Sequence, residues 1–393
     1  MKVPIAVPTF GPEELEAALE PLKTGWVAQG PRVAAFEAAF ADYARCPHAL
    51  ANSSGTAALH LALAALNIGP GDEVVVPSFT WVSCANVVEL LGATAVLCDV
   101  DPRTFCASAD HFQAALTSRT RALMPVHLFG HVADMRDIMA LAQRHDLAVV
   151  EDAACAAGSW LDGQHAGTFG HVGAFSFHPR KVLTAGEGGL TITGDAAINA
   201  RIASLRNHGA EGLLVPDDHL DQHAALTPSA FNDAHPGAAA YVMADYVRPG
   251  FNYRLTDIQG AILHAQLRRL DGFVQARDRL ANRYRQALDG LPLDLPSPPE
   301  GMIHAWQSYV VTVHHDAPIS RDALADALAA EGIQTRQGTH AIHLLGAYRD
   351  RYTPEAFPGA LQAHRRSLAL PLYPTLSDEL QDYVIDAIRR AIA

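Results

Sequence analysis

The chain has 393 residues, of which 49% are hydrophobic and only 18% are charged. A chain of this length and apolar content can bury a large core, which excludes a mainly disordered protein and favours two domains. Its formal net charge of −13 argues against a general binder of nucleic acid or of membrane surfaces. No apolar run approaches the roughly 18 residues of a membrane-spanning helix, and we recognise no signal peptide.

Cysteine and histidine usage indicates neither a disulfide framework nor a metal site. The chain has five cysteines, and no two of them form a CxxC pair. An odd number without a framework is typical of a reducing compartment, so we expect a cytoplasmic protein. The 20 histidines are scattered, and the HxxH formed by His340 and His343 has no partner cluster, so we expect no metal.

Helical and strand patterns alternate along the first half of the chain. Apolar spacing predicts helices within 12–45, interrupted by a turn that contains Gly25 and Pro31, and a Ser/Gly turn opens a helix within 51–66. The next strands are predicted at 73–77, 94–100, 122–128, 147–153, 173–177 and 189–194, and the helices between them at about 81–92, 108–116 and 133–145. Because the strand runs are continuously apolar, both sheet faces must be covered, which predicts an open, mostly parallel α/β sheet.

Residues 209–248 break this alternation, since they are rich in His, Asp, Pro and Ala and have little periodicity. We expect a long surface loop or insertion there. A helix over about 255–289 follows, and a Pro-rich linker then leads into a smaller region. That region is predicted to contain strands near 308–313 and 333–336 and helices over 320–331 and 377–392. We therefore predict a large α/β domain over 1–254, followed by a connecting helix and a small C-terminal α+β domain over 255–393.

Lysine is scarce, which makes the position of each lysine informative. Of the 29 Lys and Arg residues, only Lys2, Lys23 and Lys181 are lysines, and a codon bias toward arginine explains the low number. Arginine cannot replace lysine where an amine must lose its proton or form an imine. Lys181 follows a predicted strand and precedes a Gly-rich turn, so it is either a surface residue or an imine-forming one.

Three further signals lie at strand ends or at the start of a helix. Asp152 ends an apolar strand, where open α/β sheets bind ligands, and it either caps the next turn or pairs with a pyridinium nitrogen. The Ser53–Thr56 turn is an ordinary N-cap or an anion site, to which Ser176 adds a hydroxyl. Trp81 is a core residue or stacks on a flat ring. Together with Lys181, these residues are what a pyridoxal phosphate (PLP) enzyme needs.

Five segments of the chain form a recognisable series in order and spacing. They are SSGTAALHLAL at 53–63, PSFTWVSCANVV at 77–88, EDAACAAGS at 151–159, SFHPRKVLTAGEGG at 176–189 and GFNYRLTDIQGAILHAQL at 250–267. The chain in this respect resembles the DegT/DnrJ family of sugar aminotransferases, and the likeness extends over nearly its whole length. The resemblance implies a fold-type I PLP-dependent transferase, in which a large domain with a mostly parallel open sheet is followed by a smaller α+β domain.

The resemblance also implies roles for single residues. Lys181 is implied as the Schiff-base lysine, Asp152 as the partner of the pyridine nitrogen, and Trp81 as the residue that stacks on the ring. The residues implied to bind the cofactor phosphate are Gly55, Thr56, Ser176 and, from the neighbouring subunit, Asn252. Because Asn252 would reach the other subunit's cofactor, the resemblance implies a homodimer with its active sites at the interface.

Two residues depart from the family pattern near the substrate end of the site. Cys155 stands where many members have Gln or His, which can contact the phenolic oxygen of the cofactor, and a thiol is a weak hydrogen-bond partner. Gln307 stands where the motif His-x-Trp-His has its last histidine, and the 209–248 segment is longer than usual. These differences make the substrate the least transferable property of the resemblance.

The resemblance implies an aminotransferase that passes an amino group from L-glutamate to a keto sugar, a nucleotide-linked 4-keto-6-deoxyhexose. The residues expected to line the acceptor pocket are Trp26, His131, Arg336, His340 and His343, of which Arg336 suits a diphosphate. One alternative is an aminotransferase for a keto-cyclitol or another secondary-metabolite ketone. A non-catalytic PLP-binding regulator is a further alternative, which the complete set of site residues disfavours.

Overall fold

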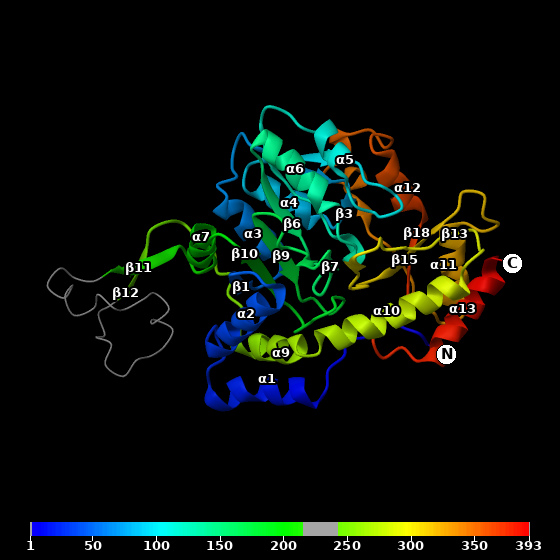
Figure 1. The fold of residues 1–393 in the computed structure, drawn as a ribbon, viewed down its shortest axis with the longest axis horizontal. Helices are drawn as coiled ribbons and strands as arrows, with labels where there is room; N and C mark the ends of the chain where they lie inside the picture. Colours follow the sequence, from blue (N-terminus) through cyan, green and yellow to red (C-terminus); the bar gives the residue numbers. More distant parts are fainter. Residues whose placement is uncertain (1, 215–242, 393) are drawn as a thin grey trace.

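A computed structural model describes residues 2–214 and 243–392, which are built around a seven-stranded sheet (Figure 1). In sheet order the strands are β1 (His48–Asn52), β10 (Gly189–Thr193), β9 (Val172–Ser176), β6 (Ala148–Asp152), β5 (Thr120–Leu123), β2 (Glu73–Pro77) and β4 (Thr94–Cys98). The five strands from β9 to β4 pair in parallel, whereas β10 is antiparallel to both its neighbours. The predicted open, mostly parallel sheet is confirmed, although the sequence pattern did not predict β1.

Helices cover both faces of this sheet. The helices of the sheet region are α1 (Pro12–Thr24), α2 (Pro31–Ala44), α3 (Gly55–Ala65), α4 (Ser83–Leu90), α5 (Ala109–Ala114), α6 (Met135–His145) and α7 (Ala196–Arg206). Phe40 of α2 packs edge-on against Phe175 of β9, whereas Gly55 of α3 abuts Ser176. Since successive residues of a strand point to opposite faces, α2 and α3 lie on opposite sides of β9.

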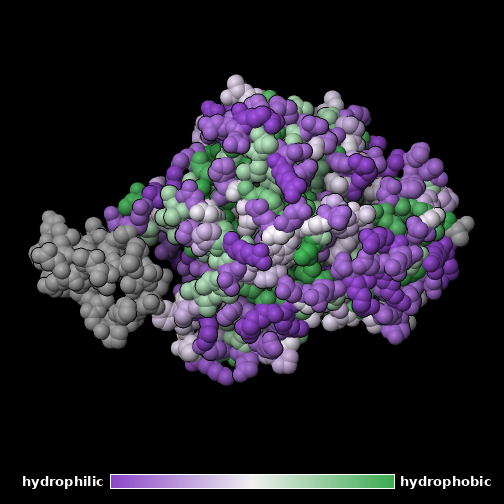
Figure 2. Space-filling view, viewed as in Figure 1, coloured by the Kyte–Doolittle hydropathy of each residue, from purple (hydrophilic) through white to green (hydrophobic). Residues whose placement is uncertain are grey.

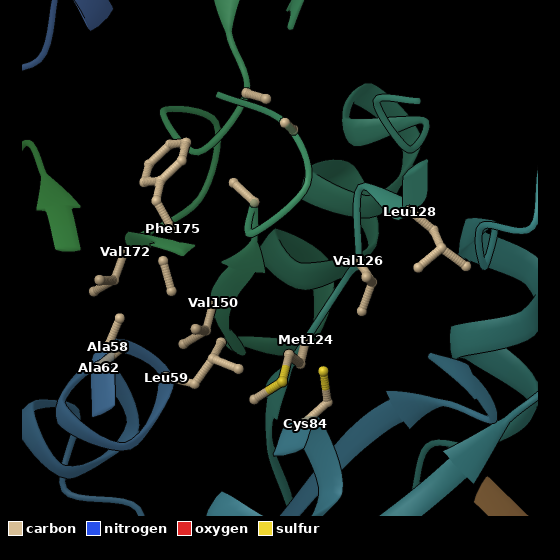
Figure 3. Packing of buried hydrophobic residues seen from close by; sticks show 14 of the residues in the cluster. Ala58, Leu59, Ala62, Cys84, Met124, Val126, Leu128, Val150, Val172 and Phe175 are labelled. Atoms are coloured by element: carbon tan, nitrogen blue, oxygen red, sulfur yellow. The ribbon is translucent and has the colours of Figure 1, made fainter. Parts of the chain in front are cut away.

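Helix α3 is buried on nearly every side, as expected for a helix that contains almost no polar residue. Its N-cap is Ser54, whose hydroxyl accepts a hydrogen bond from the Ala57 N–H. Ala58, Leu59 and Ala62 belong to the core that also contains sheet residues, and Figure 3 shows them facing Val150 and Val172. This packing fixes the helix so that its N-terminus meets the carboxyl end of β9.

Asp257 joins the start of α9 (Asp257–Leu267) to the start of α2. Its carboxylate, which is 1% exposed, accepts hydrogen bonds from the backbone N–H groups of Gly30, Arg32 and Val33 at 2.8–3.1 Å. These are N–H groups that a helix leaves without internal acceptors. The two helices approach closely, because a Cβ at Gly260 of α9 would lie 2.8 Å from the Val33 backbone.

We expect the substitution Asp257→Asn to lower the free energy of unfolding by about 2 kcal/mol, because the amide loses the charge and one acceptor at a buried helix N-terminus. Urea unfolding monitored by circular dichroism measures this change. The control Asp110→Asn, at an exposed position in α5, is expected to cost about 0.5 kcal/mol or less. Equal effects of the two substitutions would contradict this account of Asp257.

A second hydrophobic core lies around a four-stranded antiparallel sheet in the C-terminal part of the chain. In sheet order its strands are β13 (Leu293–Asp294), β15 (Tyr309–Val313), β18 (Ser367–Leu370) and β16 (Arg336–Gln337). The helices of this part are α10 (Leu270–Ala287), α11 (Arg321–Ala330), α12 (Pro358–Arg366) and α13 (Asp378–Ile392). The predicted strand near 333–336 is thus displaced, since only Arg336 and Gln337 pair with β18.

The single helix predicted over 255–289 is wrong, because the chain forms two helices, α9 and α10. The helices are separated by a turn at Arg268 and Arg269, where Arg269 has φ −104° and ψ −2° and its guanidinium pairs with Glu14 of α1 at 2.6 Å. This break allows α9 to pack against α1 and α2 while α10 continues toward α13 and the second core (Figure 1). The ion pair connects residues 255 positions apart, so no local pattern indicates it.

Two segments cross the predicted division between 1–254 and 255–393. Val3 bridges to Ile333 and packs in the second core. In the other direction, β17 (His340–Ala341) pairs with β3 (Phe79–Thr80), and Ile342 belongs to the main core. Two short pairings complete the topology, β7 (Trp160–Leu161) with β8 (Gln164–His165) and β14 (Met302–Ile303).

The predicted loop or insertion at 209–248 is in part a pair of strands. Its two ends form an antiparallel ladder of β11 (Ala210–Leu214) and β12 (Met243–Tyr246). These strands were not predicted, because the segment lacks the alternation of apolar and polar residues that is typical of a strand. The rest of the predicted insertion, 215–242, lies outside the described residues.

The surface is mainly polar, and hydrophilic residues predominate on the face shown in Figure 2. Among the helices of the described residues, none combines the length and the apolar character needed to cross a bilayer. An exception to the polar surface is α1, where Leu15, Leu19 and Leu22 are 49–66% exposed. Their spacing of four and three residues places them on one side of the helix.

Candidate active site

A cleft of about 380 Å³ opens where the carboxyl ends of β6 and β9 meet the N-terminus of α3. This is the edge at which open α/β sheets bind ligands. The predicted site residues that line it are Gly55, Thr56, Trp81, Asp152, Cys155, Ser176, Lys181 and Arg336. The second part of the chain closes one side with residues that include Gln307 and Thr339. The structure therefore brings together eight residues that are spread over 282 positions of sequence.

Asp152 is the last residue of β6 and is 5% exposed, at the floor of the cleft. Its Oδ1 accepts a hydrogen bond from the Ala154 N–H at 2.9 Å, which is the Asx-type turn expected after a strand. Its Oδ2 accepts a hydrogen bond from the thiol of Cys84 at 2.9 Å. The carboxylate thus caps the turn and also faces the cleft, so the two interpretations of Asp152 are compatible.

Lys181 lies in the loop after β9, and its amine points into the same cleft. The Nζ atom donates to the sulfur of Cys155 at 3.2 Å. The Lys181 backbone N–H donates to the His178 carbonyl, which closes a turn. The neighbouring Arg180 carbonyl accepts from the Gln307 side chain at 2.8 Å. This loop is therefore tied to the second part of the chain directly beside the lysine.

The N-terminus of α3 forms the opposite wall with Ser176. A Cβ at position 55 would lie 2.7 Å from the Ser176 Cβ, so only glycine allows the helix to approach β9 this closely. The N–H groups of Gly55 and Thr56 are in the first turn, where a helix provides no acceptor for them. Free N–H groups beside a serine hydroxyl form a site for an anion such as a phosphate.

Cations and an exposed aromatic ring surround the mouth of the cleft. Trp81 is 54% exposed and is not a core residue. Burial lowers the pKa of Arg180 below its usual value, and the charge of Arg336 lowers it further. Burial also lowers the pKa of His178, an effect that Lys181 and Arg180 reinforce. Within 2–214 and 243–392, Arg180 and Arg336 form no ion pair. Both guanidinium groups line the cleft and are open to an anionic ligand.

Three predicted acceptor residues do not line this cleft. His343 is 1% exposed and is held between the Ser78 hydroxyl at 2.6 Å and the Pro354 carbonyl. His131 borders a neighbouring hollow of about 660 Å³ that shares wall residues with the cleft, and burial lowers the pKa of His131 to about 4. His340 is nearer, since its ring centroid lies 5.9 Å from that of Trp81. His343 is buried outside the cleft, because it follows β17, whose pairing with β3 turns this segment inward.

Trp26 and Asn252 also lie outside the cleft of their own chain. Asn252 is exposed and forms a backbone bridge with Asn207. The Trp26 ring lies against Gly30 in the turn before α2. The sequence did not predict a place in the site for Cys84 or Arg180, although the position of Arg180 beside Lys181 was an available signal. Gln307, noted in the sequence as a departure from the family motif, does line the cleft.

Comparisons with known proteins agree with this geometry. The structural neighbours are fold-type I PLP-dependent aminotransferases, and the pattern of the DegT/DnrJ/EryC1/StrS aminotransferase family matches residues 8–389. The chain belongs to this family. The recognition of the family, of PLP as the cofactor and of an aminotransferase activity from the sequence is therefore confirmed.

Three solved structures illustrate the likeness. A family aminotransferase from Brucella abortus is 35% identical, with a TM-score of 0.84 over 97% of this chain and 95% of that chain. DesV from S. venezuelae, in complex with a ketimine intermediate, is 36% identical, with a TM-score of 0.83 over 96% and 94%. Spr1654 from Streptococcus pneumoniae, named as a sugar aminotransferase and solved in its PLP form, is 26% identical, with a TM-score of 0.88 over 100% and 98%.

The residues present fit PLP. The cofactor has a phosphate, a protonatable ring nitrogen and an aldehyde that reacts with an amine. The cleft offers the free N–H groups of α3 and the Ser176 hydroxyl for the phosphate, the Asp152 carboxylate for the ring nitrogen, and the Lys181 amine for the aldehyde. Gly55 lets α3 approach Ser176 closely, and a Cβ at position 55 would fill the space in which a phosphate could be held.

Proposed function

We propose that this enzyme transfers an amino group from L-glutamate to a keto sugar, and that the acceptor is a nucleotide-linked 4-keto-6-deoxyhexose. The observation that carries the proposal is the meeting of Lys181, Asp152 and the α3 N-terminus in one cleft. The mouth of this cleft holds Arg180 and Arg336, which form no ion pair within the part of the chain that the structure describes. The neighbour Spr1654, named as a sugar aminotransferase, supports a sugar as the acceptor.

Each polar group of the cleft has a place in the proposed reaction. When bound, PLP supplies an aldehyde that captures amines and a ring that accepts electrons as a bond at the α-carbon weakens. The Lys181 amine takes the proton from the α-carbon of the amino donor and later delivers a proton to the carbon of the acceptor. Asp152 keeps the ring nitrogen protonated, Trp81 stacks on the ring, and Gly55, Thr56 and Ser176 hold the phosphate.

Arg180 and Arg336 support an anionic acceptor. A guanidinium binds the oxygens of a phosphate or a carboxylate through two parallel hydrogen bonds. Both side chains line the cleft, and their mutual repulsion is relieved when an anion lies between them. A diphosphate satisfies this requirement in the acceptor half-reaction, and the carboxylates of glutamate satisfy it in the donor half-reaction.

A panel of acceptors tests the proposal. The enzyme is first loaded with the amino group from glutamate, and the return of the PLP absorbance band is then followed after each acceptor is added. We expect nucleotide-linked 4-keto-6-deoxyhexoses to restore the band fastest. A keto-cyclitol that restores the band when no nucleotide sugar does so would replace the proposed acceptor by the alternative, which the departures at Cys155 and Gln307 favour.

We also propose that two copies of the chain form a dimer with shared active sites. The exposed leucines of α1 form an apolar strip that a second copy would cover. Asn252 is exposed and does not line the cleft of its own chain, as expected for a residue that serves the other copy. In such a dimer Asn252 would complete the phosphate site of the partner's cofactor.

Mixing two inactive variants tests the shared site. We expect Lys181→Ala and Asn252→Ala each to be weakly active alone, and a refolded mixture to regain up to about a quarter of wild-type activity. The reason is that half of the dimers are mixed, and each mixed dimer has one site with both defects and one intact site. Mixing Lys181→Ala with Asp152→Asn is the control, since both residues belong to the same chain's cleft. Equal recovery in the two mixtures, or a monomeric enzyme by light scattering, contradicts the shared site.

A further inference from the structure

The Asp152 carboxylate accepts a hydrogen bond from the buried thiol of Cys84, for which the sequence indicates no role. Cys84 of α4 is completely buried, and its Sγ lies 2.9 Å from Asp152 Oδ2. The Ala154 N–H occupies the other oxygen at 2.9 Å. Figure 3 shows the Cys84 side chain beside Met124, within the core. The carboxylate is thus fixed at both oxygens before any ligand enters.

The thiol is the donor in this contact. Burial raises the pKa of the Cys84 thiol well above its usual value, and the negative charge of Asp152 raises it further. The thiol therefore keeps its proton at neutral pH. The Thr80 hydroxyl lies 3.7 Å from the same sulfur, and since the thiol proton points to Asp152, the hydroxyl is the donor to the sulfur. The result is a chain of hydrogen bonds from Thr80 through Cys84 to Asp152, in which each bond polarises the next.

This series of hydrogen bonds begins at the junction between the two parts of the molecule. Thr80 belongs to β3, where its register partner is His340 of β17. Thr80 is 1% exposed and also lines the cleft, so its hydroxyl has little freedom to turn elsewhere. The hydrogen bonds that hold the Asp152 carboxylate therefore begin at the strand that pairs with β17.

We infer that Cys84 is a positioning residue for transamination, whose thiol holds the Asp152 carboxylate in the orientation in which it meets the cofactor ring nitrogen. The inference rests on the proposed role of Asp152. Because a thiol is a weaker donor than a hydroxyl, it orients the carboxylate while withdrawing little of its negative charge. That charge is what keeps a ring nitrogen protonated. A serine at position 84 would orient the carboxylate equally well but neutralise more of the charge.

Three variants of the full-length enzyme test the inference. In Cys84→Ala the donor is lost, and we expect about tenfold weaker PLP binding, a weaker visible circular dichroism band of the bound cofactor, and a lower kcat with an unchanged KM for glutamate. In Cys84→Ser the donor is restored, and we expect the affinity and the dichroism band to return toward the wild-type values. Cys98→Ala is the matched control, since Cys98 of β4 is also buried but its charged neighbour is Asp99 and not Asp152.

The outcomes separate the inference from the proposed role of Asp152. If Cys84→Ala binds PLP with wild-type affinity and dichroism while Asp152→Asn does not, the inference is overturned and the role of Asp152 stands. If Asp152→Asn also matches the wild type, the role of Asp152 fails and the inference fails with it. Should Cys84→Ala not fold, Cys84→Ser decides the question, because a loss of affinity as large as that of Asp152→Asn would overturn the inference.

Discussion

The substitution Lys181→Ala is expected to lower the rate of amino transfer by about 10³-fold or more, because it removes both the imine-forming amine and the group that moves the proton. Lys181 is the amine that lines the cleft, with its Nζ 3.2 Å from Cys155. Single-turnover measurements of the cofactor absorbance after glutamate addition give the rate. Added methylamine is expected to restore part of it, since a free amine can enter the space that the side chain leaves.

The substitution Lys181→Arg separates charge from chemistry. It keeps the positive charge beside His178 and Arg180, but a guanidinium neither loses its proton at neutral pH nor forms an imine. We therefore expect the arginine variant to be as inactive as the alanine variant. The control Lys2→Arg, at an exposed position, is expected to leave the rate within about twofold. An arginine variant with a tenth of the wild-type rate would show that Lys181 acts only as a cation.

The sheet could be predicted where the sequence signal is local. The strands β2, β4, β6, β9 and β10 are short apolar runs, and each lies within or next to its predicted range. Strand β1 was missed, because its five residues begin with His48 and end with Asn52 and so lack a continuous apolar run. The break between α9 and α10 depends on a pairing of Arg269 with Glu14 across the fold, which the helical pattern of 255–289 does not contain.

In the site, too, local sequence signals could be predicted, whereas contacts across the fold could not. Lys181, Asp152 and Ser176 could be placed at one sheet edge, since Asp152 and Ser176 end parallel strands whose carboxyl ends meet there and Lys181 follows the second of these strands. The orientation of His343 could not be predicted, because it depends on the register of β17 against β3, two strands of two residues each. Cys84 resembles any other buried apolar residue of a helix, and only the coordinates place its sulfur at Asp152.

Asp152 and Glu151 are adjacent carboxylates on β6 that are expected to respond to amide substitution in opposite ways. Successive strand residues point to opposite faces, so Asp152 reaches the cleft whereas Glu151 is buried away from it. Glu151 accepts hydrogen bonds from the His127 ring at 2.8 Å and from the N–H groups of Gly167 and Gly170 at 2.8 and 2.6 Å. We therefore expect Asp152 to serve the reaction and Glu151 to serve the fold.

We expect Asp152→Asn to lower kcat by about 10²- to 10³-fold, because an amide cannot stabilise a protonated ring nitrogen, an electrostatic loss of the size seen when a preorganised polar group is removed. Its stability is expected to change little, since the amide oxygen still accepts from the Ala154 N–H. Glu151→Gln is expected to lower the free energy of unfolding by about 3 kcal/mol and to leave kcat of the folded enzyme within about threefold.

Urea unfolding and steady-state kinetics on both variants make this a crossed test, in which each variant is the control for the other. The contrast follows from geometry, because the amide at position 151 places an N–H₂ group among strong donors that need an acceptor. The amide at position 152 keeps the acceptor for the Ala154 N–H and loses, besides the charge, only the acceptor for the weak thiol donor of Cys84. If Asp152→Asn keeps kcat within about threefold, the ring-nitrogen role of Asp152 is refuted. If Glu151→Gln lowers kcat as strongly as Asp152→Asn without loss of stability, β6 does not divide the two roles between its faces.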